Sequence, residues 1–264
     1  MGTLDTLFAG TRAEGRAALI GYLPAGYPTV DGSIDTLKSM VDSGCDLLEV
    51  GVPYSDPVMD GPTIQAAADE ALRSGFRLRD LFRTVEAVSA AGGKAVVMTY
   101  FNPVLRYGVD AFSRDLAAAG GLGMITPDLI PDEAQPWLEA SAAHGLDRIF
   151  LVAPSSSPER IAATTAASSG FVYATAVMGV TGARDAVGVE AEALVARTRE
   201  HTSLPVGVGL GVRSGDQAAQ VAGFADAVIV GSAFVTAART GPDAVRALTE
   251  ELAEGVRRTP APIG

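Results

Sequence analysis

The sequence predicts an α/β fold, a single (β/α)8 barrel of the TIM type with an extra helix at its N-terminus. Three observations support this prediction. Eight short apolar runs alternate with amphipathic stretches, they recur at nearly even spacing, and no linker rich in Pro, Gly or Ser separates them. We therefore expect residues 1–264 to form one domain. An open, doubly wound sheet is the alternative, but its dinucleotide fingerprint is poorly met, because GVGLGVRSG comes only at the seventh strand.

Hydrophobic periodicity places the elements of the first half. Residues 3–15 carry Leu4, Leu7 and Phe8 at helical spacing and form the extra helix. Each strand that follows is an apolar run, which suits a parallel strand buried on both faces. The strands expected here are 18–24, which closes in Pro and Gly, then 47–53, 95–100 and 123–129. The amphipathic helices expected here are 31–43, which ends at Gly44, then 64–74, 78–91, 109–119 and 132–144, around the only tryptophan.

The same alternation continues in the second half of the chain. Apolar runs predict strands at 148–154, 171–177, 205–211 and 227–233. Helices are expected at 158–168, 189–201 and 214–222, followed by a last helical region that ends near Arg258. A helix after every strand is the arrangement that a closed parallel sheet requires.

Composition and charge exclude several classes of protein. The formal net charge is −11 with no basic run, which argues against nucleic-acid and anionic-membrane partners. No apolar run approaches the roughly 18 residues of a membrane span, and the N-terminus lacks a signal-peptide pattern. We therefore expect a cytoplasmic protein. The single cysteine, Cys45, excludes an intrachain disulfide framework.

The stretch 47–65, LLEVGVPYSDPVMDGPTIQ, combines a buried strand with acidic residues. Side chains alternate across a strand, so Leu48 and Val50 share the face that packs on helices. Glu49 lies on the opposite face with Gly51, which leaves room beside the carboxylate. A polar, Pro-rich loop carrying Asp56 and Asp60 follows.

In such barrels the reactive groups gather at the C-terminal ends of the strands. The polar candidates there are Glu49, Asp56, Asp60, Tyr100, Asn102, Asp128, Tyr173, Thr175, Thr181 and Arg184. Lys94 precedes the third strand at the opposite end, and Lys38 lies in a helix, which argues against a Schiff-base lysine. His144 and His201 fall in or at the ends of outer helices, which argues against a His-ligated metal site. Proton transfer is therefore left to carboxylates.

Glu49 is the stronger acid–base candidate, because burial among apolar residues raises the pKa of a carboxyl group towards neutrality. The alternative is a structural glutamate paired with an arginine. Asp60, in a loop at the mouth, is expected to stay ionised and to hold an N–H group or a developing cation. Its alternative role is to fix a turn before Gly61 and Pro62.

Glycines at the ends of the last three strands predict a phosphate site. The motifs are GVTG (179–182), GLG (209–211) and GS (231–232). Glycines let backbone N–H groups approach an anion, and a helix N-terminus beyond them adds partial positive charge. Barrels commonly hold a phosphate at this corner, and an acidic protein without a basic cluster needs such a cradle of amides.

At these residues the chain resembles the α subunit family of tryptophan synthase over nearly its whole length. The most specific motif is LEVGVPYSDPVMDGPTIQ (48–65), supported by LPAGYP (23–28), MTYFNP (98–103), PDLIPDE (127–133), GFVY (170–173), GVTG and VGSA (230–233). The resemblance implies reversible cleavage of indole-3-glycerol phosphate into indole and glyceraldehyde 3-phosphate. It also implies no cofactor in this chain, and transfer of indole to a β subunit that carries pyridoxal phosphate, within an α2β2 heterotetramer.

The resemblance assigns roles by motif. Glu49 would protonate indole C3 and move the glycerol hydroxyl proton, and Asp60 would bind the indole N–H. The residues implied for the phosphate are Gly182, Gly211, Gly231 and Ser232. Those implied to line or support the indole pocket are Tyr100, Asp128, Tyr173 and Leu210. Thr181 would close over the substrate and touch Asp60, while Pro53 and Asp56 would face the β subunit.

Three positions depart from the family pattern: Ala176 where serine is usual, Leu210 where phenylalanine is common, and Met59 in place of a smaller residue. They leave both acids in place and bear on pocket shape and loop closure. The alternatives to an α subunit are a free-standing lyase that releases indole, a catalytically idle partner subunit, and another phosphosugar enzyme such as an aldolase or isomerase. The positions of lysine and histidine argue against the last, and the presence of both acids argues against the idle subunit.

Overall fold

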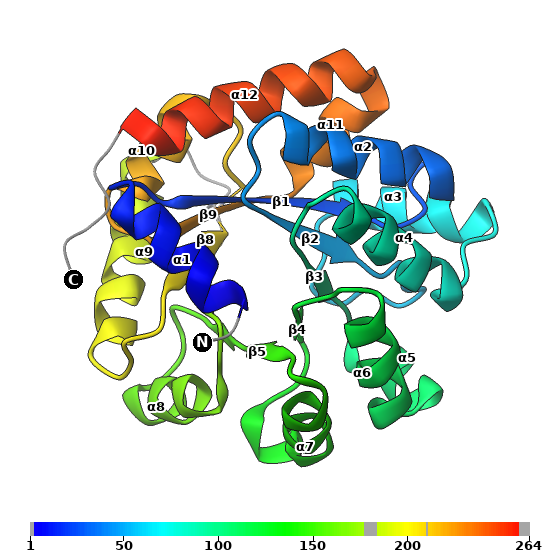
Figure 1. The fold of residues 1–264 in the computed structure, drawn as a ribbon. Helices are drawn as coiled ribbons and strands as arrows, with labels where there is room; N and C mark the ends of the chain where they lie inside the picture. Colours follow the sequence, from blue (N-terminus) through cyan, green and yellow to red (C-terminus); the bar gives the residue numbers. More distant parts are fainter. Residues whose placement is uncertain (1–2, 177–183, 210, 259–264) are drawn as a thin grey trace.

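The computed structural model describes residues 3–176, 184–209 and 211–258. Their strands form one sheet of nine parallel members, and helices surround it (Figure 1). The strands are β1 Ala18–Pro24, β2 Leu47–Gly51, β3 Ala95–Met98, β4 Gly123–Ile125, β5 Asp147–Ile149, β6 Leu151–Val152, β7 Val172–Thr175, β8 Val206–Gly209 and β9 Ala227–Val230. Their order is β5-β4-β3-β2-β1-β9-β8-β7-β6.

The sheet is a closed eight-stranded barrel, because β5 and β6 are one strand interrupted at Phe150. The sheet runs from β5 at one edge to β6 at the other, and only Phe150 separates these two in the chain. The Tyr173 N–H donates to the carbonyl of Phe150 at 3.1 Å, so hydrogen bonding continues across the interruption. The predicted TIM barrel is confirmed, and the predicted strand 148–154 corresponds to this interrupted strand.

The helices follow the predicted order with three differences. They are α1 Thr3–Ala13, α2 Val30–Asp42, α3 Pro62–Arg73, α4 Leu78–Ala90, α5 Phe101–Tyr107, α6 Val109–Ala118, α7 Gln135–His144, α8 Pro158–Ala167, α9 Arg184–Arg199, α10 Gly215–Ala222, α11 Ser232–Thr240 and α12 Pro242–Arg258, with a 3-10 turn at Pro131–Glu133. The short α5 was not predicted. The predicted helix 132–144 is divided into the 3-10 turn and α7. The last helical region is two helices, because Gly241 adopts φ +137° and Pro242 then begins α12.

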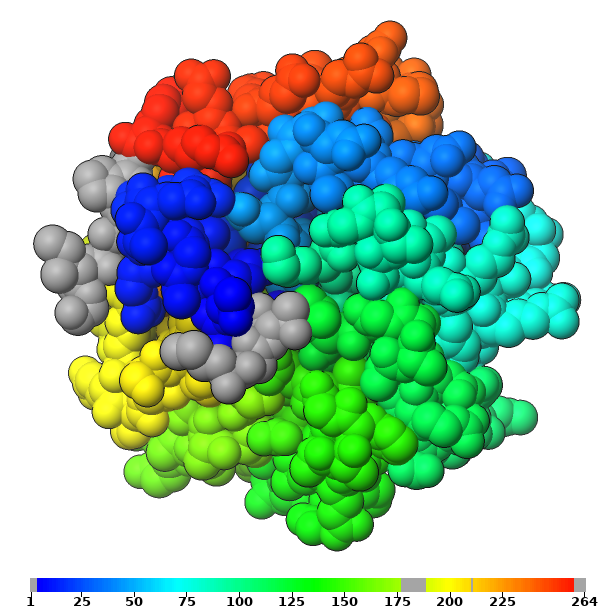
Figure 2. All heavy atoms as spheres, viewed as in Figure 1, coloured from blue at the N-terminus to red at the C-terminus, as the bar shows by residue number. Residues whose placement is uncertain are grey.

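Helix α1 closes the N-terminal end of the barrel. Its Leu4, Leu7 and Phe8 belong to the interior cluster, which also contains Leu47 and Phe171. The ring centroids of Phe8 and Phe171 lie 5.7 Å apart. In the space-filling view α1, in dark blue, covers the face that lies between α12, α2 and the yellow α9 (Figure 2). The barrel interior is therefore filled at this end and can open only at the other.

The alternation predicted for β2 is confirmed. Leu48 and Val50 pack in the outer layer between sheet and helices, whereas Leu47 lies in the barrel interior. In the parallel register Glu49 is the partner of Tyr22 on β1 and of Val96 on β3. The structure fills the room that Gly51 leaves with the Tyr22 ring, since a Cβ at Gly51 would lie 2.4 Å from the Tyr22 hydroxyl oxygen. Within the described ranges, no helix is both long and apolar enough to cross a membrane.

Candidate active site

A cavity of about 180 Å³ opens at the C-terminal end of the barrel strands. Apolar and aromatic side chains form most of its wall, and two carboxylates, Glu49 and Asp60, enter it. The residues that line it are Tyr22, Glu49, Met59, Asp60, Gly61, Ile64, Met98, Pro127, Leu151, Tyr173, Thr175, Ile229 and Gly231. This composition suits a flat apolar ring that is held by a few polar groups.

Glu49 is buried at the base of this cavity, with 1% of its surface exposed. Its Oε2 atom has no hydrogen-bond partner among the described residues. Burial, and secondly the charge of Asp60, raises the pKa of Glu49 to about 8. Within the described part of the chain no arginine forms an ion pair with it, so the alternative of a structural ion pair is not supported. A carboxyl group of this kind holds a proton at neutral pH and can exchange it.

Asp60 lies in the loop between β2 and α3, half-buried at the mouth of the cavity. Burial raises its pKa, and a hydrogen bond with the Tyr100 side chain acts in the opposite direction. The side-chain amide of Gln65 donates to the Asp60 carbonyl at 2.8 Å and ties the loop to α3. The expectation that Asp60 is ionised stays a prediction.

Tyr100 supports the loop that carries Asp60. Its hydroxyl accepts a hydrogen bond from the Met59 N–H at 2.9 Å. Its ring lies 5.2 Å from that of Tyr54, whose hydroxyl accepts from the Asn102 side-chain amide at 3.0 Å. Tyr100 is the N-cap residue of α5, so a helix that the sequence analysis missed holds the loop in place.

Asp128 acts on the same helix. Both of its carboxylate oxygens accept from the Phe101 N–H, at 2.9 Å and 3.1 Å, in the first turn of α5. A carboxylate at a helix N-terminus satisfies a free N–H and interacts favourably with the helix dipole. Asp128 therefore positions α5, and through it Tyr100, without lining the cavity itself.

Two tyrosines line the same cavity as Glu49, the buried Tyr22 on the neighbouring strand β1 and the partly buried Tyr173 on β7. Tyr173 on β7 was predicted and lines the cavity, and its pKa is raised well above 10 by burial and secondly by the charge of Glu49. Tyr22 on β1 was missed, and its pKa is raised by burial and then by the charges of Asp60 and Glu49. Gly209 provides the space for Tyr173, because a Cβ there would lie 2.6 Å from its hydroxyl oxygen.

Some residues of the predicted phosphate corner lie at the mouth of the cavity. Gly231 lines the cavity, and Ser232 begins α11 directly after it. A Cβ at Gly231 would meet Ile64 and Tyr22 only at ordinary contact distance, 3.6 Å, so it would project into the cavity rather than into the core. Gly211 adopts φ +70°, a backbone conformation that favours glycine. The remaining predicted residues, Thr181, Gly182 and Leu210, lie outside the described residues.

Comparison with known proteins decides the family. The family "Tryptophan synthase alpha chain" matches residues 8–260. The tryptophan synthase alpha chain of Nocardia farcinica is 69% identical over 254 residues, which is 96% of each chain. That of Mycobacterium marinum is 66% identical over 259 residues, covering 98% of this chain and 96% of the relative.

This chain belongs to the tryptophan synthase alpha chain family. Solved structures agree with that assignment. A crystal structure of tryptophan synthase from M. tuberculosis in an open form superposes with a TM-score of 0.92 at 63% identity, covering 97% of this chain and 99% of that one. The alpha subunit from Legionella pneumophila gives a TM-score of 0.89 at 30% identity, with 98% and 99% coverage.

The lysine and histidine side chains lie away from the cavity, as the sequence predicts. Lys94 directly precedes β3, at the N-terminal end of the barrel, and lines a pocket there. His144 is the last residue of α7 and lies 2.8 Å from an Asp110 carboxylate oxygen. Among the described residues, no group of three or more His, Cys, Asp or Glu side chains could hold a metal ion.

The residues predicted to face a β subunit lie in the loop after β2. Pro53 is buried, whereas Asp56 is exposed and accepts a hydrogen bond from the Ser55 hydroxyl at 2.5 Å. Farther along the loop, Val58 is 80% and Met59 55% exposed. Large exposed apolar side chains recur after β3 and β4, at Leu105 and Tyr107 on α5 and at Ile130.

Sequence reasoning missed the apolar wall of the cavity and the role of Tyr22. The missed lining residues are Tyr22, Ile64, Met98, Pro127, Leu151 and Ile229. A signal for Tyr22 was available, because Ala18 and Ile20 belong to the interior cluster and alternation along β1 places Tyr22, which lines the cavity, on the same face. An aromatic residue at the C-terminal end of that face points to the mouth of the barrel. Of the positions that depart from the family pattern, Met59 does line the cavity.

Proposed function

We propose that Glu49 and Asp60 together carry out the reaction of the family, the reversible cleavage of indole-3-glycerol phosphate into indole and glyceraldehyde 3-phosphate. The observation that carries this proposal is the buried Glu49 carboxyl, which has one unbonded oxygen and a raised pKa in the same cavity as Asp60. A protonated acid in an apolar pocket is the group that protonation of a carbon atom requires.

The reaction balances with Glu49 as the single proton carrier. Protonated Glu49 gives its proton to indole C3, and the ring becomes an indoleninium cation. The glycerol hydroxyl next to the breaking bond then returns a proton to the Glu49 carboxylate and becomes the aldehyde. The electrons of the carbon–carbon bond flow back into the ring and restore indole, and Glu49 ends in its starting state.

Asp60 holds the opposite edge of the ring in this proposal. Its carboxylate accepts the indole N–H and stabilises the cation, because opposite charges attract strongly where water is excluded. Tyr100 keeps the loop that carries Asp60 in place through the Met59 N–H. Tyr173 lines the cavity, and Asp128 supports the cavity through α5. Glu49 and Asp60 thereby keep their positions around the ring.

The phosphate lies at the corner formed by Gly231, Ser232 and Gly211, and the family resemblance adds Gly182 to this set. Support comes from Gly231, which leaves its backbone open to the cavity, and from the N-terminus of α11 directly behind it. For Leu210 and Thr181, which lie outside the described residues, we propose the roles that the family resemblance implies, a contact with the indole ring and a contact with the bound substrate. The cleavage needs no metal or organic cofactor in this chain, because the protonated ring accepts the electrons of the broken bond. The test is to dialyse the chain exhaustively against a chelator and to remove pyridoxal phosphate. We expect turnover to persist after this treatment.

A β subunit binds at the rim formed by the loops after β2, β3 and β4, in an α2β2 heterotetramer. Pro53 and Asp56 contribute from the first of these loops. The three strands are neighbours in the sheet, so their loops meet at one rim. Each loop or the helix that follows it exposes large apolar side chains, namely Val58, Met59, Leu105, Tyr107 and Ile130. A patch of this kind, beside the exit of an apolar product, suits a partner that receives the product.

Titration of the purified chain with a cognate β subunit tests the function. We expect lyase turnover by the chain alone, a marked rise as the β subunit is added, and a complex whose mass fits two copies of each chain. Turnover without any rise and without a complex would favour a free-standing lyase. Loss of turnover in Glu49→Gln, with the β subunit still activated, separates the catalytic role of the acid from the assembly.

A further inference from the structure

A second pocket, larger than the substrate cavity, lies beside the predicted phosphate corner. Its volume is about 430 Å³, and its wall is formed by α3, α11, α12 and the segment between β8 and α10. The residues that line it are Thr63, Arg213, Ser232, Ala233, Thr236, Ala237 and Leu248. We call it the Arg213 pocket. Ser232, at the start of α11, connects it to Gly231 and thus to the cavity that holds Glu49.

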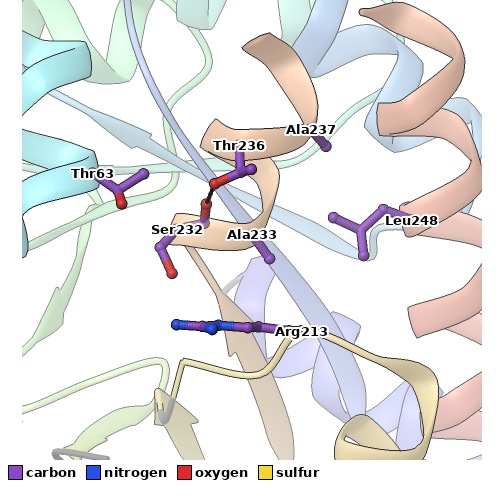
Figure 3. Close-up of a pocket in the computed structure, with 7 residues that line it drawn as sticks. All are labelled: Thr63, Arg213, Ser232, Ala233, Thr236, Ala237 and Leu248. Carbon is purple, nitrogen blue, oxygen red and sulfur yellow. Dashed lines mark hydrogen bonds between the residues drawn. The ribbon is translucent and has the colours of Figure 1, made fainter. Parts of the chain in front are cut away.

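Among the described residues that line this pocket, Arg213 is the only charged one, and its guanidinium group is available for a ligand. Figure 3 shows the side chain extending beneath Ser232, whose hydroxyl points towards it, with Thr63 on the far side. Within the described part of the chain, no carboxylate forms an ion pair with Arg213 and none lines the pocket. Other arginines of this acidic protein do form ion pairs, for example Arg160 with Asp132 at 2.7 Å.

The backbone around Arg213 is held firmly, although its side chain has no ion-pair partner among the described residues. The Arg213 N–H donates to the Gln217 side-chain carbonyl at 2.7 Å. Ser214 is the N-cap residue of α10, and the Gly215 N–H donates to the Glu251 carboxylate at 2.7 Å. These bonds fix the base of the side chain on both α10 and α12. A fixed base lowers the conformational entropy that the guanidinium group loses when it binds.

Resting on the proposed function, we infer that Arg213 forms an ion pair with the phosphate group of the substrate. The Thr236 hydroxyl donates to the Ser232 carbonyl at 2.9 Å, which leaves the Ser232 hydroxyl to face the same space as the guanidinium group (Figure 3). A phosphate at the start of α11 would thus meet backbone amides and the Ser232 hydroxyl on one side and a guanidinium on the other. Arginine suits this task because its planar donors match two phosphate oxygens at once.

The reverse reaction gives the sharpest test. Its two substrates are glyceraldehyde 3-phosphate, which carries the phosphate group, and indole, so the KM of each can be measured separately. We expect Arg213→Gln to raise the KM for glyceraldehyde 3-phosphate on the order of tenfold, as loss of a charge-assisted hydrogen bond does. The KM for indole should stay within about twofold, because the indole end of the cavity is untouched. Arg213→Lys, which keeps the charge without the fork of donors, should give an intermediate KM.

The matched control is Arg246→Gln, which removes the same charge from an exposed arginine on α12 that does not line the pocket. Its two KM values should equal those of the wild type. A wild-type KM for glyceraldehyde 3-phosphate that rises with ionic strength more steeply than that of Arg213→Gln would support the ion pair.

Three results would overturn the inference. Arg213→Gln with an unchanged KM for glyceraldehyde 3-phosphate would show that the amides hold the phosphate alone. An equal rise in both KM values would show that the substitution disturbs the fold of the mouth. A wild-type protein without turnover in either direction would overturn the proposed function itself, and the inference with it.

Discussion

Each end of the barrel buries an ionisable side chain, but within the part of the chain that the structure describes only the one at the N-terminal end is paired with an opposite charge. At the N-terminal end Arg16, with 8% of its surface exposed, forms two bonds to the Asp46 carboxylate at 2.7 Å and 2.8 Å. A third bond joins it to Glu14, and the Leu19 N–H also donates to Asp46. At the C-terminal end Glu49 is still more deeply buried, and one of its oxygens has no partner among the described residues.

The paired Arg16 and the incompletely paired Glu49 serve different purposes, the first stability and the second function. A buried charge that is fully paired keeps a fixed protonation state, and removal of its partner strongly destabilises the folded chain. A buried carboxyl that is not paired raises its pKa and keeps a proton near neutral pH, at a cost to the folded state. The end closed by α1 thus contributes stability, whereas the open end keeps an exchangeable proton for chemistry.

Replacement of Glu49 by Gln gives the largest expected effect. Turnover in both directions should fall by about 10³-fold or more, because general acid–base catalysis commonly contributes factors of this size. Stopped assays of indole formation and consumption measure it. A variant that retained more than about a tenth of the wild-type rate would contradict the role of Glu49.

The same variant should be more stable than the wild type at neutral pH. The folded protein keeps the Glu49 proton up to pH about 8, whereas the unfolded chain loses it near the ordinary value of 4.5. Because the folded state binds more protons in that window, its stability falls as pH rises from about 4.5 to 8. Glu49→Gln removes this dependence and should gain about 3 kcal/mol at pH 7, and little at pH 4. Denaturant unfolding at both pH values checks the sign.

Asp46→Asn should do the reverse and thereby sharpen the comparison. It leaves the buried Arg16 guanidinium without its main partner, so we expect a loss of about 3–5 kcal/mol in the free energy of unfolding. The kcat of the protein that remains folded should stay within about twofold, because the substitution lies at the far end of the barrel. Loss of kcat without loss of stability would break the division between the two ends.

Gly231→Ala tests substrate binding at the mouth of the cavity and leaves both Glu49 and Asp60 unchanged. The new methyl group would project into the cavity, where its nearest neighbours lie at 3.6 Å. We expect the KM for indole-3-glycerol phosphate to rise roughly tenfold, because a methyl group keeps the ligand from the backbone, with a melting temperature within about 2 °C of the wild type. A large fall in melting temperature with an unchanged KM would mean that the glycine serves the fold instead.

Tyr100→Phe gives the smallest effect of the series. It removes the hydroxyl that accepts from the Met59 N–H and bonds to Asp60, while the ring that packs on Tyr54 remains. We expect kcat to fall by about three- to tenfold, because the loop loses one hydrogen bond. Tyr54→Phe is the control, because it keeps the Tyr100 hydroxyl. Steady-state kinetics of both variants would show whether the loss of kcat comes from Asp60 or from the contact between Tyr54 and Tyr100.

The barrel and both acids could be predicted from the sequence because each leaves a local signal. Alternation places Glu49 on the inner face of β2, and the polar loop that follows places Asp60 at the mouth. Helix α5 gave no such signal, since its first turn depends on Asp128, which lies far along the chain. The free guanidinium of Arg213 depends likewise on which carboxylates lie nearby, and only the folded chain determines that.

Titration of the Glu49 carboxyl tests the central claim most directly. Carbon-13 NMR of protein labelled at the glutamate carboxyl carbon follows it, and the signal is assigned by its absence from Glu49→Gln. The account predicts a midpoint near pH 8 that moves lower in Asp60→Asn, because the charge of Asp60 adds to the effect of burial. A midpoint near 4.5 would mean that Glu49 is ionised at neutral pH and cannot donate the proton that the cleavage needs.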